Sequence, residues 1–213
     1  MGKRARSEGP AGARKSRKTL TKRVNKLTRI VGKPEIKTHT TSFSDGDVNK
    51  AGVFFKLMEI PQGDGAVNRD GNKVRVVGAQ WSYKLNSQGS TNQASLCRVG
   101  IICDRATDGT LPVQADIQTT VNDPLSLKTF TSRHGGKRFW WLHDKKCVIN
   151  ATTNIDTRWV HGFKKLNLTV NWAAGTTGNP TKNPIYAYVQ SDAVAASSDV
   201  QSEGFFRIFF VEN

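Results

Sequence analysis

The stretch VGAQWSYKL at residues 77–85 alternates apolar side chains with small or polar ones. Its apolar set is Val77, Ala79, Trp81, Tyr83 and Leu85. A period of two places every second side chain on the same face of a β-strand, so this segment is predicted to be a strand with one buried face. The stretch KLNLTVNW at residues 165–172 follows the same rule, and together the two segments indicate an all-β chain.

Six further segments have the composition of strands. They span residues 36–43, 52–59, 95–103, 137–144, 184–190 and 204–212. Turn-rich segments separate the strands, and nothing after residue 37 predicts a helix longer than two turns. Eight strands with uneven connections and no repeat period favour an antiparallel sandwich of two sheets, the jelly roll among them. We therefore expect a single eight-stranded jelly-roll domain over residues 36–213.

The last predicted strand breaks the alternation, because residues 205–211 (FFRIFFV) are apolar on both faces except at Arg207. Such a strand either lies centrally in a sheet that is covered on both sides or contributes to a contact between subunits. Of these two interpretations, central burial is favoured.

Charge divides the chain into two parts. The 213 residues carry a formal net charge of +15, and residues 1–37 hold 13 Lys and Arg against Glu8 and Glu35, a net of +11. The other 176 residues hold 19 basic and 15 acidic side chains, a net of only +4. A segment with this much charge and no aromatic residue buries too little apolar surface to offset its ordering entropy. Residues 1–35 are therefore predicted to form a disordered basic arm.

The expected partner of this arm is a nucleic acid, because cations without aromatic or acidic neighbours neutralise phosphates without selecting among them. The predicted contacts are Lys3, Arg4, Arg6, Arg14, Lys15, Arg17, Lys18, Lys22, Arg23, Lys26, Arg29 and Lys33. A membrane-surface contact and an inert solubilising tail are the alternatives.

Two smaller patterns lie inside the arm. The basic clusters at residues 14–18 and 22–23 have the composition of a nuclear import signal, which would make host import machinery a partner. Leu20, Val24, Leu27 and Val31 have the spacing of an amphipathic helix. An isolated helix of this length is marginal in water, so we expect it to form only against a partner.

Residues suited to catalysis or metal binding are few. His39, His134, His143 and His161 follow no metal-binding spacing, and His143 and Cys147 have no second pair to complete a zinc site. No nucleophile elbow, phosphate-binding loop or paired-carboxylate signature occurs. The odd number of cysteines, three, argues against a disulfide framework. We expect a non-enzymatic protein with no cofactor and no metal.

Two segments combine cations with aromatic rings, the composition that suits a surface for single-stranded nucleic acid. These segments span residues 128–146 and 158–165. In a strand, Phe139 and Trp141 share one face, whereas Arg138 and Trp140 share the other. Arg138 and Trp140 are therefore candidate contacts of the folded domain. The alternative is that most of these rings fill the core of the sandwich.

Three stretches carry a family resemblance. The first joins IPQG at 60–63 and NRDGNKV at 68–74 to WSYKL at 81–85, the second is CRVGIICDR at 97–105, and the third joins NPIYAY at 183–188 to FRIFFV at 206–211. In their order and spacing, and with the basic start, they resemble capsid proteins of small circular single-stranded DNA viruses, the geminivirus, nanovirus and circovirus-like group.

The resemblance implies a jelly roll that assembles with itself, in about sixty copies, into a T=1 icosahedral shell around single-stranded DNA. It also implies that the arm faces inward, binds the genome and doubles as the import signal. The protein would then be found in the virion and in the host nucleus, with no membrane partner. The same likeness makes Arg69, Arg98, Arg105 and Arg138 weaker candidates for genome contacts.

Proteins of other classes share parts of this pattern. A capsid protein of a small RNA virus has the same layout, since phosphate contacts do not separate RNA from DNA. A monomeric nucleic-acid-binding module would explain the arm but not the large sandwich. A carbohydrate-binding jelly roll would explain the sandwich but not the arm.

Overall fold

The computed structural model describes residues 22–23, 34–87, 94–107, 109–118, 120, 123–125, 138–150, 156–173, 178–193 and 200–212. The chain divides into two units, Met1–Glu35 and Ile36–Asn213. In the first unit, Lys22 and Arg23 are helical and exposed. The predicted disorder of the arm, and all but these two residues of its predicted helix, lie outside the described residues.

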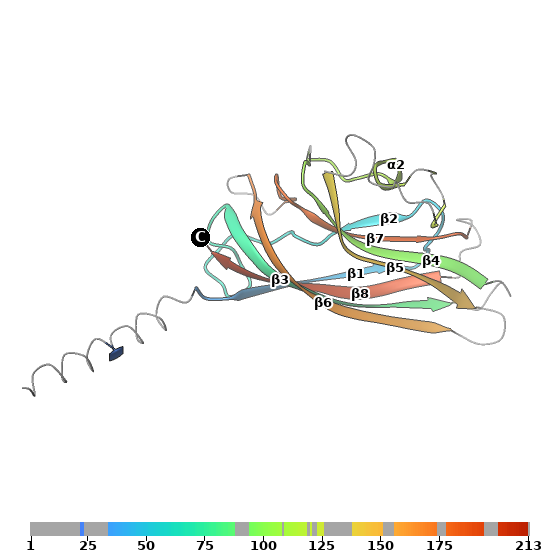
Figure 1. Ribbon diagram of the computed structural model, residues 1–213, viewed down its shortest axis with the longest axis horizontal. Coiled ribbons are helices and arrows are strands. Elements are labelled where there is room, and N and C mark those ends of the chain that lie inside the picture. The colour runs from blue at the N-terminus through green and yellow to red at the C-terminus, as the bar shows by residue number, and fades with distance from the viewer. Residues whose placement is uncertain are drawn as a thin grey trace, which may run out of the picture. The chain divides into compact units, whose positions relative to one another are not determined.

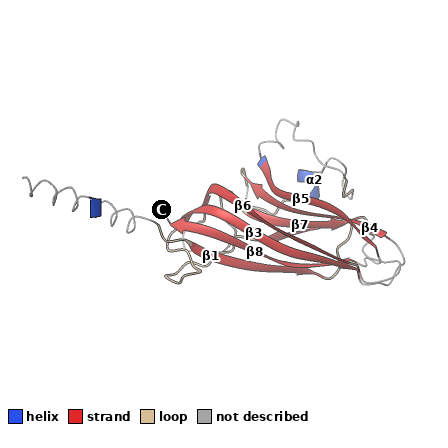
Figure 2. Ribbon diagram, turned by 60° about the horizontal axis from the view of Figure 1, so that its bottom comes forward, coloured by secondary structure: helices blue, strands red, loops and turns tan. Residues whose placement is uncertain are grey.

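The described part of the second unit contains eight strands and one short helix (Figures 1 and 2). The strands are β1 (Lys37–Asp45), β2 (Val53–Lys56), β3 (Lys73–Ser87), β4 (Ala94–Asp104), β5 (Phe139–Asn150), β6 (Thr157–Asn171), β7 (Ile185–Ser191) and β8 (Val200–Glu212). The helix, α2 (Gln114–Ile117), lies between β4 and β5. Each of the eight predicted strands is confirmed, although β6 begins earlier and β2 is shorter than the sequence pattern indicates.

The strands form two antiparallel four-stranded sheets. Sheet A has the order β1-β8-β3-β6, and sheet B has the order β2-β7-β4-β5. Each strand pairs with its counterpart counted from the other end of the chain, so β1 pairs with β8, β2 with β7, β3 with β6 and β4 with β5. A two-stranded ribbon that is rolled up on itself gives this order, which is the jelly roll. The predicted all-β jelly-roll sandwich is confirmed.

The main core lies between the two sheets, and β3 supplies much of it. Ala79, Trp81, Tyr83 and Leu85 are at most 4% exposed, as the alternation predicts. The prediction is wrong for Val77, which is only half-buried. The strand pairing shifts by one residue between Val76 and Gly78, and such a β-bulge reverses the alternation on one side of it. On β6, the predicted apolar residues of 166–172 are buried, as expected.

The apolar strand β8 lies centrally in sheet A, between β1 and β3. Phe206, Ile208 and Phe210 point into the core and are fully buried. Phe205 and Phe209, which belong to the other face of the strand, are only half-buried. The prediction of a central strand is confirmed, but the prediction that both of its faces are covered is wrong for the described residues.

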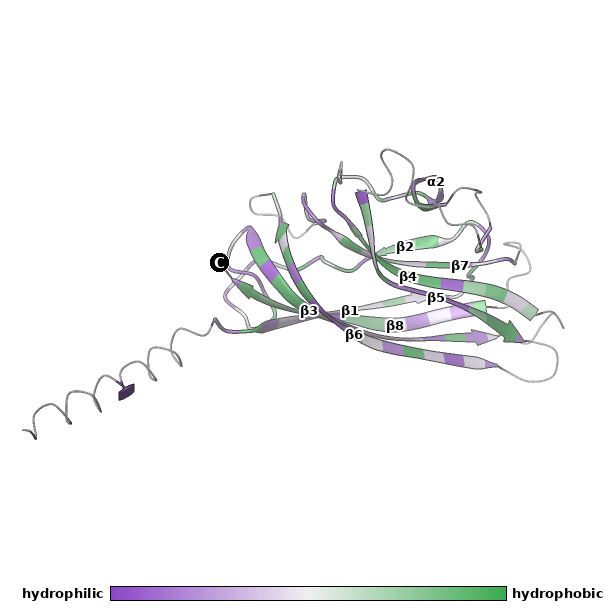
Figure 3. Ribbon diagram, in the orientation of Figure 1, coloured by the Kyte–Doolittle hydropathy of each residue, from purple (hydrophilic) through white to green (hydrophobic). Residues whose placement is uncertain are grey.

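The short helix α2 lies beside sheet B, on the side away from sheet A (Figure 1). Ile117 of α2 packs against Ile102, Tyr186 and Tyr188 in a second, smaller apolar cluster. No helix in the described part of the chain is long and apolar enough to cross a membrane. On sheet A, hydrophilic and hydrophobic residues follow one another along β6 (Figure 3). The outer face of sheet B is thus partly covered by α2, whereas Val148 of the edge strand β5 is 52% exposed.

Candidate nucleic-acid interface

Most of the predicted arm contacts lie outside the described residues. Of the twelve cations, the structure describes Lys22 and Arg23, and both are exposed. The two clusters of the predicted import signal, apart from these two residues, also lie outside the described range. The role of the arm in binding nucleic acid therefore stays a prediction.

Lys37 contributes to the net charge of the first 37 residues, but it has a structural role. It is the first residue of β1 and is only 9% exposed, and its Nζ lies 2.8 Å from Asp70 Oδ1 and 3.2 Å from Glu212 Oε1. The hydrogen bond to the Asp70 carboxylate holds the pKa of Lys37 above its ordinary value. Residues 1–35 thus retain twelve cations against two glutamates, a net of +10.

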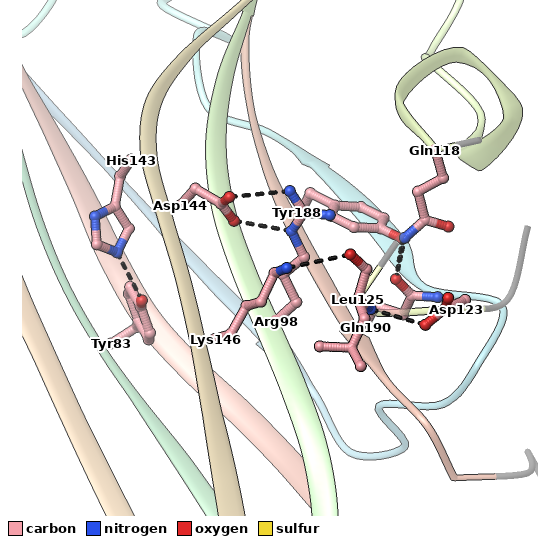
Figure 4. A network of polar contacts seen from close by, with 10 residues as sticks. All are labelled: Tyr83, Arg98, Gln118, Asp123, Leu125, His143, Asp144, Lys146, Tyr188 and Gln190. Carbon is pink, nitrogen blue, oxygen red and sulfur yellow. Dashed lines mark hydrogen bonds and ion pairs between the residues drawn. The ribbon is translucent and has the colours of Figure 1, made fainter. Parts of the chain in front are cut away.

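Two of the weaker candidates, Arg69 and Arg98, are buried, with no exposed surface. Arg69 lies 4.8 Å from the centre of the Trp172 ring and donates to the Ile60 carbonyl oxygen. Arg98 donates to both carboxylate oxygens of Asp144, at 2.8 and 3.0 Å (Figure 4). The prediction that these two arginines contact a genome is wrong, because their guanidinium groups hold loops and strands together inside the fold.

Arg138 precedes β5 and is used to neutralise a buried carboxylate. Its Nη2 lies 2.9 Å from Asp104 Oδ2, and the Asp104 side chain is 0% exposed. The Arg138 side chain keeps 24% of its surface exposed, so its contact with nucleic acid stays a prediction. Arg105, in the turn that follows β4, is exposed and stays a candidate.

Trp140 is the exposed member of the tryptophan pair in β5. Its side chain is 38% exposed, whereas Trp141 packs against the small apolar cluster on sheet B. Lys164 Nζ lies 5.2 Å from the centre of the Trp140 ring, within the range of a cation–π contact. The predicted availability of one tryptophan is confirmed, and its contact with nucleic acid stays a prediction. Residues 126–137 of this basic and aromatic segment lie outside the described residues.

Every second residue of the second basic and aromatic segment, from Trp159 to Lys165, lies on the outer face of sheet A, which we call the open face. Register places residues from four strands on it, and these are Thr38, Thr40, Ser42 and Ser44 of β1, Gly78, Gln80, Ser82 and Lys84 of β3, Trp159, His161, Phe163 and Lys165 of β6, and Glu203, Phe205, Arg207 and Phe209 of β8. In one row across the sheet, Trp159 is beside Lys84 and Lys84 is beside Glu203. The open face thus combines aromatic rings, hydroxyl groups and cations.

The aromatic rings of the open face are accessible. Trp159 is 66% exposed and Phe163 is 56% exposed. Phe163 meets Phe209 edge-on, with ring centres 5.9 Å apart, and its Cζ lies 3.0 Å from the position that a Cβ on Gly78 would occupy. Glycine at this position therefore leaves room for the ring to lie over β3.

Cations outnumber carboxylates on the open face. Lys84 forms an ion pair with Glu203, and its Nζ lies 5.8 Å from the centre of the Trp159 ring. Arg207 Nε donates to Thr40 Oγ1 at 3.0 Å. Arg207 and Lys165 form no ion pair within the described residues. Rings beside unneutralised cations are suited to stacking unpaired bases and attracting their phosphates.

The spacing of the residues in β6 indicates that they share this face. Trp159, His161, Phe163 and Lys165 are two residues apart, so a strand must place them together. Lys164 belongs to the opposite side and donates to the Leu142 carbonyl oxygen at 3.3 Å. The sequence does not determine which of the two faces of this strand packs against the core. From the sequence alone, Trp159 and Phe163 could therefore be core residues.

The described residues contain no group of three or more His, Cys, Asp or Glu side chains placed to hold a metal ion. His143 Nε2 lies 2.8 Å from the Tyr83 hydroxyl (Figure 4), and burial lowers the pKa of His143. Cys97 and Cys103 are buried and free, and burial raises the pKa of both thiols. These groups are therefore parts of the core.

The topology and the open face define the chain as a jelly-roll β-sandwich with an aromatic and cationic sheet face. No protein-family model matches the chain, and no curated protein matches it. Among solved structures, a chain of desmodium yellow mottle tymovirus is similar at 8% identity and a TM-score of 0.35, over 85% of each chain.

A chain of the infectious bursal disease virus Gx strain is similar at 12% identity and a TM-score of 0.16, and a chain of T=1 particles derived from infectious bursal virus at 15% and 0.16. Each covers 85% of this chain, which spans 41% of the length of those two. All three are structures of viruses or virus-derived particles. At TM-scores this low, the similarity does not establish a shared function.

Proposed function

We propose that this chain is the capsid protein of a small virus, which assembles with itself into a closed shell and packages single-stranded DNA through its basic arm. The observation that carries the proposal is the combination of two parts in one chain. One part is a jelly roll whose strands pair as β1·β8, β2·β7, β3·β6 and β4·β5. The other is a 35-residue segment with twelve cations, which leads into β1.

The jelly roll supports self-assembly because this architecture recurs in viral capsid domains. Closed point-group symmetry is the usual form of a homo-oligomer, and an icosahedral T=1 shell holds about sixty copies. The apolar residues that remain exposed give further support. Trp159, Phe163, Val148 and Val113 are each more than half exposed. Trp159 and Phe163 lie on the same face of β6, where a partner subunit would cover both rings.

The positive charge of the arms is comparable with the negative charge of a small single-stranded genome. With a net of +10 per arm, sixty copies bring about 600 positive charges into a shell. A single strand carries about one negative charge per nucleotide, so the arms offset a substantial part of a genome on the order of one to two kilobases. A much longer genome would exceed the charge that this arm supplies.

We also propose that the chain enters the nucleus of its host cell. The clusters at residues 14–18 and 22–23 are proposed to bind host import machinery, so that the protein reaches the nucleus where a circular DNA genome would be replicated. The exposure of Lys22 and Arg23 is compatible with this role. A capsid protein of a single-stranded RNA virus is the second candidate, because phosphate contacts by the arm carry no information about the sugar.

A nuclease-protection competition tests the proposed function. The full chain is assembled with equal amounts of circular single-stranded DNA and single-stranded RNA of the same length, and then treated with DNase and RNase. We expect both strands to be protected inside particles, because the arm contacts the phosphates that both share. Retention of DNA in excess would support the proposed DNA genome. Retention of RNA in excess would favour the RNA-virus alternative. Binding of both strands without protection would contradict the shell and favour a monomeric binding module.

A further inference from the structure

A hollow of about 410 Å³ lies at one end of the open face. Three consecutive residues from each of three neighbouring strands line it, together with one side chain from β6. These are residues 42–44 of β1, 82–84 of β3 and 203–205 of β8, with Trp159. Its volume falls at the lower end of the range of small-molecule sites, about 300–1,000 Å³. The hollow is therefore large enough for a single nucleotide.

The hollow exists because small side chains lie beside large ones in register. Phe205 is paired with Ser42 on one side and with Ser82 on the other. In the next row, Ser44, Glu203, Lys84 and Trp159 follow one another across the sheet. The serines leave space above the strands, and the rings of Trp159 and Phe205 border that space.

Trp159 has the largest exposed fraction of the large apolar side chains in the described part of the chain, 66%. An indole gains most from partial burial when a flat, polarisable group stacks on its face. Lys84 Nζ lies 5.8 Å from this ring and pairs with Glu203. Hydroxyl groups of the serines and the Glu203 carboxylate supply donors and acceptors for the polar edge of a flat ligand. A nucleobase, which is flat and carries donors and acceptors along its edge, has the matching chemistry.

We propose that this hollow binds one unstacked base of a single-stranded nucleic acid, with Trp159 as the stacking surface. A base inside a duplex already has both faces stacked and its pairing edge occupied, so the hollow selects single strands. The site does not depend on the arm for its chemistry, and it rests on the proposed function only in that the bound strand is the packaged one.

Charge favours a nucleic acid over a protein as the occupant. Lys84, Lys165 and Arg207 face one carboxylate, Glu203, on the open face. The segment that precedes β1 carries a net of +10 and is covalently joined to the edge strand of the same sheet. The arm and the hollow belong to one chain, so their affinities for one strand combine as those of two linked sites do.

The test uses the full chain and a fluorescent oligothymidine strand, at a salt concentration that suppresses most phosphate contacts. The variant Trp159→Ala is expected to bind the strand about 5- to 150-fold more weakly, the range measured when one stacking ring is removed. Trp159→Phe, which keeps a ring, should retain most of the affinity. Val148→Ala removes a 52%-exposed apolar side chain of β5 and should leave the affinity unchanged. A duplex probe should not distinguish the three variants.

A second readout locates the base directly. An oligonucleotide that carries 5-iodouracil is cross-linked to the full chain by light, and the attached peptide is identified by mass spectrometry. We expect attachment at Trp159. Unchanged affinity of Trp159→Ala together with attachment elsewhere would overturn the proposal.

Two controls separate base binding in the hollow from misfolding of the variant and from a contact between subunits. An unchanged thermal unfolding midpoint shows that Trp159→Ala folds, as expected for an exposed side chain. If Trp159→Ala abolishes particles but the free subunit binds oligothymidine normally, a second copy of the chain occupies the hollow and the proposal is overturned. If no variant forms particles yet Trp159→Ala still weakens binding, the capsid proposal fails and the base site stands.

Discussion

Deletion of residues 1–33 is expected to abolish most nucleic-acid retention while the jelly roll stays folded. The deletion removes all twelve arm cations and lowers the net charge of the chain from +15 to +4. It ends before β1, so Lys37 keeps its ion pairs with Asp70 and Glu212. Because each phosphate that is neutralised releases counterions, affinity for single strands falls with salt at a log–log slope of about −0.7 per phosphate.

The measurement is the salt dependence of oligonucleotide affinity, by fluorescence anisotropy, for the full chain and for the deletion variant. Twelve engaged cations set a limit of about −8 for the part of the slope that the arm contributes. We expect most of this part to be lost on deletion. A full-length variant with glutamine at the same twelve positions serves as the matched control and should lose the same amount. If the affinity of the full chain does not depend on salt, or if the deletion variant retains as much nucleic acid as the full chain, the proposed role of the arm is contradicted.

Substitution of Asp144 by alanine is expected to lower the free energy of unfolding by about 3 kcal/mol. This is the lower end of the range for breaking a buried ion pair. Asp144→Ala removes the carboxylate that Arg98 contacts with two hydrogen bonds. The Arg98 side chain is 0% exposed, and a guanidinium cannot lose its charge at any ordinary pH. The Asp144 side chain is 27% exposed, so water entering the gap moderates the loss.

Urea unfolding of the unassembled subunit, followed by tryptophan fluorescence, measures this effect, since the Arg98 guanidinium lies 4.6 Å from the Trp141 ring. Glu59→Ala removes the exposed partner of Lys56 and should cost less than about 1 kcal/mol. A double variant, Arg98→Met with Asp144→Leu, should recover most of the loss, because it leaves no buried charge. A cost for Asp144→Ala as small as that of the exposed pair would show that Arg98 does not depend on this carboxylate.

The alternation of the sequence is sufficient to predict the strands, and it fails where strands are irregular. Ala79, Trp81, Tyr83 and Leu85 lie in the core because a regular pleat has a period of two. Val77 does not, because the β-bulge beside it is set by pairing with two other strands and leaves no local signal. The sequence predicts the class of fold, a two-sheet sandwich, but not the order of the strands within each sheet. That order depends on pairing between distant segments, and no single segment determines it.

The candidate site is harder to predict than the fold. Arg69 and Arg98 look like spare cations in the sequence, yet each is buried against a tryptophan ring. Trp172 is far from Arg69 in the sequence, as Asp144 is from Arg98, so composition gives no warning. Trp159 and Phe163 are recognisable as members of a basic and aromatic segment. Their exposure follows from sheet A having no cover within the described residues, which only the tertiary structure reveals.

Negative-stain electron microscopy of the full recombinant chain, with an ultraviolet absorbance spectrum of the same fraction, tests the central claim most directly. About sixty copies of a 23.5 kDa chain make a shell of about 1.4 MDa, so we expect uniform round particles roughly 20 nm across. An absorbance spectrum dominated by nucleic acid should accompany them, because the arms retain cargo. A field without particles, at low and at high salt alike, would contradict the capsid account and leave a small nucleic-acid-binding jelly roll.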